Sequence, residues 1–353
     1  MMGLKTNLFK SLSKSTSLQK AVRGVVVGRK LRFPEVISIE SSSHCNADCI
    51  MCPRELLTRS KGNMASDLYE KIIDECAEHS RSVKLIQPFM FGEPFINKQL
   101  VEMIKYTKSR IPSVPVNVST NGSLLNAERA REIIDSGLDK INIDIDGATK
   151  ETFEGVRIGL DYDQVASNAR HLMSLKRESG SRKPEITVTI INMDETASEI
   201  EDFKTQWRHA ADNVVVQSYT TWTGSVEDRN TGEMENASTV GGFTFPCKHP
   251  FEEFVIAHDG KVSICCLDFD FKVVVGDVSK ESIRDIWNGQ ALNDVRQKMI
   301  DGRYQDLDIC SQCNNYIFQT ECSWHYLWKD GEAEDPLRPK IPTAQPTVPS
   351  TAD

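Results

Sequence analysis

Three cysteines, Cys45, Cys49 and Cys52, stand close together in the run His-Cys-Asn-Ala-Asp-Cys-Ile-Met-Cys-Pro-Arg, just after a short apolar segment. Their spacing is Cys-x3-Cys-x2-Cys. A closed cluster of four irons and four sulfides takes four protein ligands, so three thiolates leave one iron open. The alternative is a zinc site, but structural zinc takes four protein ligands, usually in Cys-x2-Cys pairs. The triplet therefore predicts an iron–sulfur site with one open iron, where a further ligand binds and chemistry occurs.

Length and composition limit the class of protein. The 353 residues suffice for one large domain and a small one, and the formal net charge of −9 argues against a nucleic-acid backbone as the main partner. No apolar run reaches the roughly 18 residues of a membrane span, and the N-terminal stretch lacks the apolar core of a signal peptide. The ten cysteines are therefore expected to serve metal or catalysis in a reducing, cytoplasmic compartment.

The two ends of the chain differ from the middle. Residues 1–34 form a basic extension, because the first 32 residues carry eight Lys and Arg and no acid. We interpret it as a solvated helical extension packed on the main domain, and the alternative is peripheral contact with an anionic membrane surface. Residues 331–353 are rich in Pro, Thr and Ala, which predicts a disordered tail.

Short β-branched runs alternate with helical segments across residues 35–218. The expected strands are Val36–Ile39, Val83–Ile86, Val116–Ser119, Ile141–Ile145, Ile186–Ile191 and Val214–Gln217. The expected helices are Asp67–His79, Gln99–Lys108, Ala127–Ser136, Tyr162–Lys176 and Ser198–His209. Six strands with helices between them predict a parallel sheet with right-handed crossovers, and a ligand site at the carboxyl ends of its strands. Cys76 lies on the apolar face of its helix, which predicts a buried thiol rather than a ligand.

The second half of the chain has a different pattern. Residues 219–243 are polar and rich in turn formers, which predicts a linker before a small domain at residues 244–330. Phe254–Ala257 and Val262–Cys265 flank the turn residues His-Asp-Gly and predict a β-hairpin. Two helical segments, Ser282–Trp287 and Leu292–Ile300, follow before a cysteine-rich end.

The triplet and the strand–helix alternation resemble the radical S-adenosylmethionine (SAM) family over about residues 35–330. The resemblance implies an α/β fold, a partial (β/α)6 barrel with a small C-terminal iron–sulfur domain of the SPASM or twitch type. In that family SAM chelates the open iron of a [4Fe–4S] cluster. An electron from the cluster cleaves SAM to a 5′-deoxyadenosyl radical, which abstracts hydrogen from the substrate. The resemblance also implies an external electron donor such as flavodoxin or ferredoxin.

The resemblance continues at the ends of later strands. Phe91-Gly92-Glu93-Pro94 resembles the Gly-Gly-Glu-Pro motif of the family, in which an acidic side chain, here Glu93, meets the SAM amino group. Phe91 replaces the first glycine, Asp144 stands where many relatives carry Ser, and Met51 stands where an aromatic side chain often packs on adenine. Ordinary turn chemistry is the alternative for each motif taken alone. The positions that the resemblance assigns to SAM are Met51, Gly92, Glu93, Pro94, Ser119, Asn121, Asp144 and Arg157.

A second cysteine set follows the linker. Cys247, Cys265, Cys310 and Cys313 are spaced as Cys-x17-Cys, a gap of 44 residues, and Cys-x2-Cys. With Gly260 before Cys265, the set resembles the extension of the family, and it implies an auxiliary [4Fe–4S] cluster with four thiolates. Such a saturated cluster suits electron transfer. The alternative is a structural zinc ribbon, since zinc and clusters share soft thiolate ligands.

Two cysteines remain near this set. Side chains alternate along a strand, so Cys266 is expected to face away from Cys265. Cys266 and Cys322 are interpreted as buried thiols, with a role as hydrogen-atom donors as the alternative; Cys322 is also a candidate cluster ligand. Glu227 and Arg229 lie in the linker where a substrate can reach them, and the alternative is that they are solvated loop charges.

The two cysteine sets together predict the type of reaction. Hydrogen abstraction followed by electron transfer to an auxiliary cluster is a dehydrogenation, and the four-cysteine spacing is similar to that of aminocyclitol-oxidising members of the twitch group. We therefore expect a small polar substrate such as a sugar or aminocyclitol. The alternatives are an epimerase with a cysteine hydrogen donor, or a maturase acting on a ribosomal peptide or protein. A non-enzymatic alternative is an iron–sulfur electron carrier or a zinc-stabilised binding module.

Overall fold

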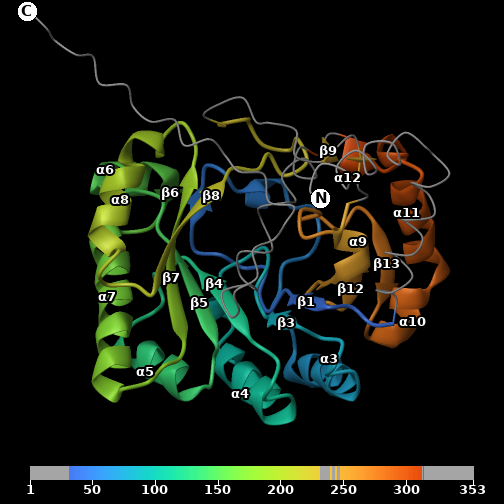
Figure 1. Ribbon diagram of the computed structural model, residues 1–353, viewed down its shortest axis with the longest axis horizontal. Helices are drawn as coiled ribbons and strands as arrows, with labels where there is room; N and C mark the ends of the chain where they lie inside the picture. Colours follow the sequence, from blue (N-terminus) through green and yellow to red (C-terminus); the bar gives the residue numbers. More distant parts are fainter. Residues whose placement is uncertain (1–31, 231–238, 241–242, 245–246, 312, 314–353) are drawn as a thin grey trace, which may run out of the picture.

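The computed structural model of the chain describes residues 32–230, 239–240, 243–244, 247–311 and 313 (Figure 1). Nearly all of the basic extension, Cys322 and the tail at residues 331–353 lie outside the described residues, so the expectations for them stay predictions. Within the described residues, no helix combines the length and the apolar character needed to cross a membrane.

Six parallel strands form the barrel in two groups. β1 pairs with β3, and the other four strands form a sheet in the order β4-β5-β7-β8. One parallel bridge, between Ile86 and Val116, connects the two groups. The α/β class is confirmed, but the expected continuous parallel sheet is interrupted at this bridge. The strands are β1 (Val36–Ile39), β3 (Leu85–Gln87), β4 (Asn117–Thr120), β5 (Lys140–Asp144), β7 (Glu185–Asn192) and β8 (Asn213–Ser218).

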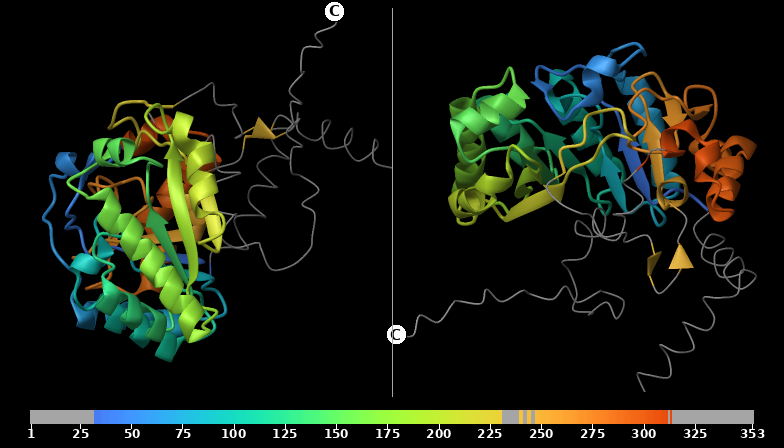
Figure 2. Two further views of the ribbon diagram at one scale, coloured as in Figure 1. Left: turned by 90° about the vertical axis from the view of Figure 1, so that its left-hand side faces the viewer. Right: turned by 90° about the horizontal axis from the view of Figure 1, so that it is seen from above.

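Helices cover the outside of these strands (Figures 1 and 2). Their first residues follow local capping signals: Asn126 accepts a hydrogen bond from the Arg129 amide, and Asp161 from the Gln164 amide. The helices are α3 (Ser66–Glu78), α4 (Leu100–Arg110), α5 (Ala127–Asp135), α6 (Lys150–Val156), α7 (Tyr162–Ser179) and α8 (Ile200–Trp207). Short 3-10 turns are η1 (Pro53–Leu56), η2 (Pro94–Ile96), η3 (Ala197–Glu199) and η4 (Tyr304–Asp306).

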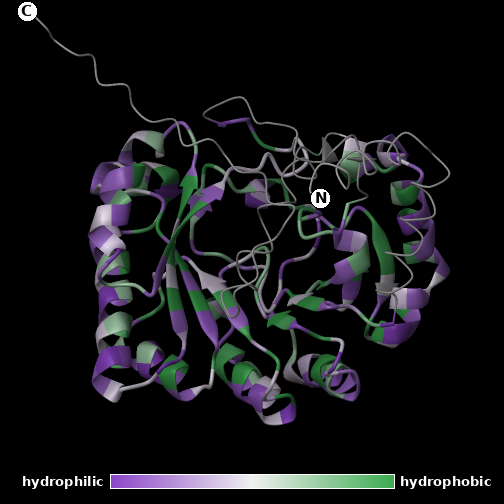
Figure 3. Ribbon diagram, in the orientation of Figure 1, coloured by the Kyte–Doolittle hydropathy of each residue, from purple (hydrophilic) through white to green (hydrophobic). Residues whose placement is uncertain are grey.

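The apolar face of α3 shows how the sequence pattern becomes packing. Tyr69, Ile72, Ile73 and Cys76 are fully buried, at the three- and four-residue spacing of one helix face. Figure 3 shows hydrophilic residues on much of the outer helix surfaces, and apolar residues alternating with hydrophilic ones along several strands. Full burial of one isoleucine side chain contributes about 1.5–3 kcal/mol. The prediction that Cys76 is a buried core thiol is confirmed.

The hairpin after the linker extends the barrel sheet. β11 pairs in parallel with β1, with Phe254 beside Ile37, and β12 then pairs antiparallel with β11. The five-stranded sheet has the order β13-β12-β11-β1-β3. Its remaining strands are β11 (Glu253–Ile256), β12 (Lys261–Ser263) and β13 (Val274–Asp277). The C-terminal helices are α9 (His249–Glu252), α10 (Ile283–Asn288), α11 (Gln290–Ile300) and α12 (Asp308–Ser311), and the short strands are β2 (Asp48–Cys49), β6 (Arg157–Ile158), β9 (Thr239–Val240) and β10 (Phe243–Thr244).

Candidate active site and cysteine centres

The first cysteine triplet forms one compact loop after β1. Cys49 lies in β2, which pairs with β6 so that Cys49 stands beside Arg157, and the Cys52 amide donates to the Cys49 carbonyl at 3.0 Å. Burial, with smaller contributions from the nearby thiols of Cys49 and Cys45, raises the pKa of Cys52 to about 12. The three sulfurs are therefore close enough to act on one another electrostatically. Binding of iron releases the protons of these thiols, and the positive charge of the iron offsets the free-energy cost of a buried thiolate.

Arg157 places a cation beside this triplet. One guanidinium nitrogen of Arg157 lies 4.0 Å from the Cys49 sulfur, and another lies 2.6 Å from the carboxylate of Asp146. Asp146 is fully buried and also accepts a hydrogen bond from the Ile191 amide at 2.7 Å. The aspartate thus fixes the direction of the guanidinium, and the positive charge favours the thiolate form of Cys49.

Gly92 makes the close backbone contact that the motif requires. A Cβ atom added at Gly92 meets the Ser42 carbonyl oxygen at 2.4 Å and the His44 carbonyl oxygen at 2.6 Å, so no other residue is accommodated without a shift. The next residue, Glu93, donates its amide to the His44 carbonyl at 2.8 Å. Phe91, which stands at the position of the first glycine of the family motif, does not make this close backbone contact; Gly92 makes it. The ring of Phe91 packs with Phe271 at a centroid distance of 6.0 Å.

The carboxylate of Glu93 holds two loops together. It accepts hydrogen bonds from the Thr120 hydroxyl at 2.7 Å, the Asn121 amide at 2.8 Å and the Phe95 amide at 3.2 Å. Burial nevertheless raises the pKa of Glu93 to about 7. These contacts place Glu93 at the strand ends beside the cysteine loop, with Pro94 opening η2 directly after it. Contact of Glu93 with the SAM amino group stays a prediction.

The polar residues predicted after β4 and β5 form two pairs. Ser119 donates to Asp144 at 3.0 Å, and burial raises the pKa of Asp144. Asn121 donates to the side-chain oxygen of Asn46 at 3.0 Å. Asn46 lies between Cys45 and Cys49, so this bond connects the cysteine loop to the end of β4. Asn46 was not among the predicted residues, although its place inside the cysteine run was a usable signal.

Met51 and Trp222 connect the two halves of the site. Met51 is buried in a cluster with Val156, Met193 and Tyr219, and its carbonyl accepts the Trp222 indole N–H at 2.9 Å. Trp222 has a φ of 49° and the following Thr223 a φ of 60°, values that only a few per cent of non-glycine residues adopt. Such backbone strain is concentrated at functional sites. The turn-rich composition of residues 219–243 predicted turns in this segment but not the positive φ values of Trp222 and Thr223. Packing of Met51 on adenine stays a prediction.

The second cysteine set is assembled from three distant segments. Cys247, Cys265, Cys310 and Cys313 all line one pocket, which Thr223 also reaches. Burial raises the pKa of Cys310, and the thiols of Cys265, Cys247 and Cys313 raise it further. The structure thus brings together the four cysteines that their spacing selected. Four thiols lining one pocket suit either an iron–sulfur cluster or zinc.

The expectation that Cys266 faces away from Cys265 was wrong. β12 ends at Ser263, so the alternation of side chains along the strand ends before the two cysteines, which lie in the following turn. The sulfurs of Cys265 and Cys266 and a ring nitrogen of His249 lie within 4.8 Å of one another. A hydrogen bond from Cys266 lowers the pKa of Cys265, against the effect of burial. His249 was not singled out from the sequence, because a histidine two residues after a cysteine has no distinctive pattern.

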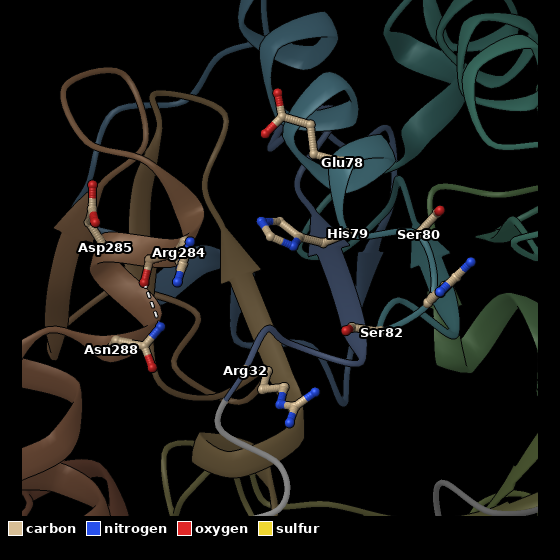
Figure 4. Close-up of a pocket in the computed structure, with 9 residues that line it drawn as sticks. Arg32, Glu78, His79, Ser80, Ser82, Arg284, Asp285 and Asn288 are labelled. Atoms are coloured by element: carbon tan, nitrogen blue, oxygen red, sulfur yellow. Dashed lines mark hydrogen bonds between the residues drawn. The ribbon is translucent and has the colours of Figure 1, made fainter.

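Two other features carry no part of this site. Arg229 forms ion pairs with Glu195 and with Glu227, the latter at 2.6 Å. The charges of Arg229 and Glu227 in the linker are therefore paired with neighbouring side chains. A wide depression lies between the C-terminal end of α3 and α10 (Figure 4). Its lining includes basic side chains such as Arg32 and Arg284, and the acidic side chains Glu78 and Asp285. None of the residues lining it belongs to either cysteine set, and we assign it no role.

Comparison with known proteins identifies the family. The radical SAM superfamily profile matches residues 39–205, and the profile of the SPASM iron–sulfur cluster-binding domain matches residues 247–314. The chain belongs to the radical SAM superfamily. A radical SAM protein with a SPASM domain binds SAM, a [4Fe–4S] cluster and auxiliary iron–sulfur, so the family supports iron–sulfur over zinc at the second pocket. The assignment of individual ligands stays a prediction.

Three matches are informative for this radical SAM enzyme. The S-adenosyl-L-methionine-dependent 2-deoxy-scyllo-inosamine dehydrogenase of Niallia circulans is 24% identical over 293 residues, 83% of this chain and 97% of that protein. The structure of BtrN in complex with AdoMet and 2-DOIA covers 80% of this chain and 93% of its own, with 20% identity and a TM-score of 0.54. Streptococcus suis SuiB bound to its precursor peptide SuiA covers 79% and 71%, with 13% identity and a TM-score of 0.61. The two structures show the shared fold.

Proposed function

We propose that this radical SAM enzyme dehydrogenates a small polar alcohol, such as a sugar or an aminocyclitol. The observation that carries the proposal is the single pocket formed by Cys247, Cys265, Cys310 and Cys313. Four thiolates saturate a cluster and leave no iron open for substrate, which suits it to electron transfer. The match to the 2-deoxy-scyllo-inosamine dehydrogenase, over 97% of that protein's length, also supports dehydrogenation.

Oxidation of an alcohol to a ketone removes one hydrogen atom, one proton and one electron. When bound, SAM on the first cluster supplies the radical that takes the hydrogen atom, and the auxiliary cluster supplies the electron acceptor. The proton leaves to a carboxylate or to water. Cys45, Cys49 and Cys52 are proposed to hold the first cluster, and the four cysteines of the second pocket the auxiliary one.

The inner face of the barrel supports a polar substrate. Ile141 and Ile143 of β5 face the core beneath the helices, so Asn142 between them faces the opposite side of the sheet. Asn117 of β4 lies on that same face. Both residues are buried, and within the described residues their side-chain oxygens have no hydrogen-bond partner. A buried amide oxygen needs a donor, and a hydroxyl or ammonium group of a substrate supplies one.

The test uses the anaerobically reconstituted enzyme with SAM, dithionite and 2-deoxy-scyllo-inosamine, followed by a panel of deuterated sugars and aminocyclitols. We expect loss of two hydrogens from one member of the panel, and deuterium transfer to 5′-deoxyadenosine. SAM cleavage that is stimulated by a peptide substrate and by no member of the panel contradicts the proposal.

Epimerisation is a second candidate that one observation favours. The sulfur of Cys266 lies within 4.8 Å of the sulfur of Cys265, and Cys266 is not one of the four proposed ligands, so its thiol can serve as a hydrogen-atom donor. Substitution Cys266→Ala separates the two reactions. An epimerase loses product with SAM cleavage retained, whereas a dehydrogenase retains ketone formation.

A further inference from the structure

Asp144 is a carboxylate on the inner face of the four-stranded sheet. Its neighbours along β5, Ile141 and Ile143, pack in the core beneath the helices. Because side chains alternate along a strand, Asp144 faces the opposite side of the sheet, where Thr189 of β7 stands beside it in register. Figure 1 shows α7 and α8 on one side of this sheet and β1 and β3 on the other. Asp144 therefore faces the interior of the barrel.

Two hydroxyl groups hold this carboxylate in place. Oδ1 of Asp144 accepts the Thr189 hydroxyl at 2.6 Å, and the Ser119 hydroxyl lies 3.0 Å from Oδ2 and 3.2 Å from Oδ1. A guanidinium nitrogen of Arg157 lies 4.0 Å from Oδ2, which is too far for a hydrogen bond. Each oxygen of an ionised carboxylate accepts about two hydrogen bonds. Among the described residues no further donor reaches Oδ2, so this oxygen keeps an acceptor position.

Three other carboxylates at the carboxyl ends of the barrel strands are closed to solvent. The side chain of Asp146 is 0% exposed and pairs with Arg157 at 2.6 Å. Glu40 is also 0% exposed within an ion pair, and Glu93 is buried with three hydrogen bonds. The side chain of Asp144, by contrast, is 24% exposed. Of these four carboxylates, Asp144 is the one that a substrate can reach.

Asp144 also lies close to the first cysteine loop. Arg157, whose guanidinium faces Asp144, reaches the Cys49 sulfur at 4.0 Å through another of its nitrogens. One guanidinium group therefore separates the carboxylate from the triplet. Partial burial raises the pKa of Asp144, although the charge of Arg157 opposes the shift. A carboxylate with a raised pKa is a better proton acceptor.

We propose that Asp144 is a catalytic residue that binds the substrate hydroxyl group to be oxidised and accepts its proton. In this oxidation the C–H and O–H bonds of the substrate break, and its C=O bond forms. The hydrogen atom passes to the radical derived from SAM, the electron to the auxiliary cluster, and the proton to Asp144, which then releases it to water. The assignment rests on the proposed function. It gives Asp144 a contact with substrate in place of the SAM contact that the resemblance implies.

The test compares Asp144→Asn, Asp144→Ser and Asp144→Glu with the unsubstituted, reconstituted full-length enzyme. The Asn and Ser variants keep a polar side chain without a carboxylate, whereas the Glu variant keeps a carboxylate. Asp135→Asn, at the exposed end of α5, is the matched control. Each protein receives SAM, dithionite and the panel of sugars and aminocyclitols. Ketone formation, SAM cleavage, iron content and SAM affinity by equilibrium dialysis are measured.

We expect Asp144→Asn and Asp144→Ser to lower ketone formation by a factor of about 100 or more, because a general base contributes at least that much to the rate. Asp144→Glu is expected to restore part of the loss, and Asp135→Asn to change nothing. SAM affinity and iron content are expected to stay unchanged in all four variants, and SAM cleavage to continue.

Three results overturn the assignment and leave the proposed function intact. Ketone formation that is equal in the unsubstituted enzyme and in Asp144→Asn shows that no carboxylate is needed there. Weaker SAM binding in both the Asn and the Ser variant assigns Asp144 to SAM. Loss of iron from both variants assigns it to support of the cysteine loop. Absence of ketone from every panel member with the unsubstituted enzyme contradicts the proposed function, and the assignment of Asp144 falls with it.

Discussion

The two cysteine sites of this enzyme are built in opposite ways. Cys45, Cys49 and Cys52 belong to one short loop, and their spacing in the sequence already brings them together. The four cysteines of the second pocket come from the segment before α9, the turn after β12, and the region of α12. The first site is therefore a local motif with tertiary supports, whereas the second exists only once the chain has folded.

The supports of the two sites also differ. The triplet is held by backbone contact with Gly92 and faces the cation Arg157. The second pocket faces the imidazole of His249 and its partner Glu253. The two regions are connected through the carboxylate of Glu40. It accepts a hydrogen bond from Arg59, in the loop after the triplet, and one from the His258 amide in the hairpin turn, at 3.0 Å. Hydrogen bonds through Glu40 therefore join the loop after the triplet to the hairpin that leads to Cys265.

The largest expected effect separates the two sites directly. Cys49→Ala removes a proposed ligand of the open cluster, so formation of 5′-deoxyadenosine is expected to fall to background. Iron content is expected to fall by about half, because the auxiliary cluster keeps its own ligands. The matched control is Cys76→Ala, which removes a fully buried thiol of α3 and leaves both iron content and SAM cleavage unchanged. Unchanged iron in Cys49→Ala contradicts the ligand assignment.

Glu40→Ala breaks the connection between the sites. It leaves Arg59 and His258 without their shared buried partner, and removal of one member of a buried ion pair costs about 3–5 kcal/mol in the free energy of unfolding. Burial raises the pKa of Glu40, but His258 and Arg59 outweigh it and hold the pKa below the ordinary value of 4.5. The contribution of Glu40 is therefore present above that pH and is lost as pH falls through the lowered pKa.

Urea unfolding of wild type and Glu40→Ala at a series of pH values measures this effect. The difference between the two proteins is expected to shrink below about pH 4.5. Glu102→Ala, which removes the partner of Lys105 in an exposed pair, is the control and is expected to change little. A difference that is constant with pH contradicts the electrostatic explanation.

Gly92→Ala tests the backbone contact behind the triplet. The added Cβ meets two carbonyl oxygens at 2.4 and 2.6 Å, so we expect a cost of about 3 kcal/mol and weaker SAM binding. Gly155→Ala is the matched control, since a Cβ there meets nothing within 4 Å. Within α6 that substitution is expected to stabilise the protein by up to about 1 kcal/mol. Thermal unfolding of both variants, with equilibrium dialysis of SAM, gives the comparison.

Trp222→Phe is expected to have the smallest effect. It keeps an aromatic ring between the sites but removes the indole donor to the Met51 carbonyl, a bond worth about 0.5–1.5 kcal/mol. Because Met51 adjoins Cys52, SAM affinity is expected to fall with stability while the auxiliary cluster signal stays unchanged. A change in the spectroscopic signal of the auxiliary cluster with unchanged SAM affinity contradicts the assignment of Trp222 as a support of the SAM site.

Much of the barrel could be predicted because its signals are local. β1 spans the predicted Val36–Ile39, and the other predicted strands and helices appear with bounds shifted by a few residues. The hairpin was predicted too, but its parallel pairing with β1 was not, since pairing between distant strands leaves no local pattern. The alternation rule failed at Cys266 because the strand ended at Ser263, before the residues to which the rule was applied.

By itself, the sequence determined the cysteine spacings, the family and the order of strands and helices, because these depend on short-range periodicity and on ligand chemistry. Only the tertiary structure decided that Gly92 rather than Phe91 makes the close contact, and that His249 faces the second pocket. It also placed Asn46 and Trp222 as supports of the first loop. Such contacts join residues far apart in the chain, and their partners are set by packing rather than by neighbouring residues.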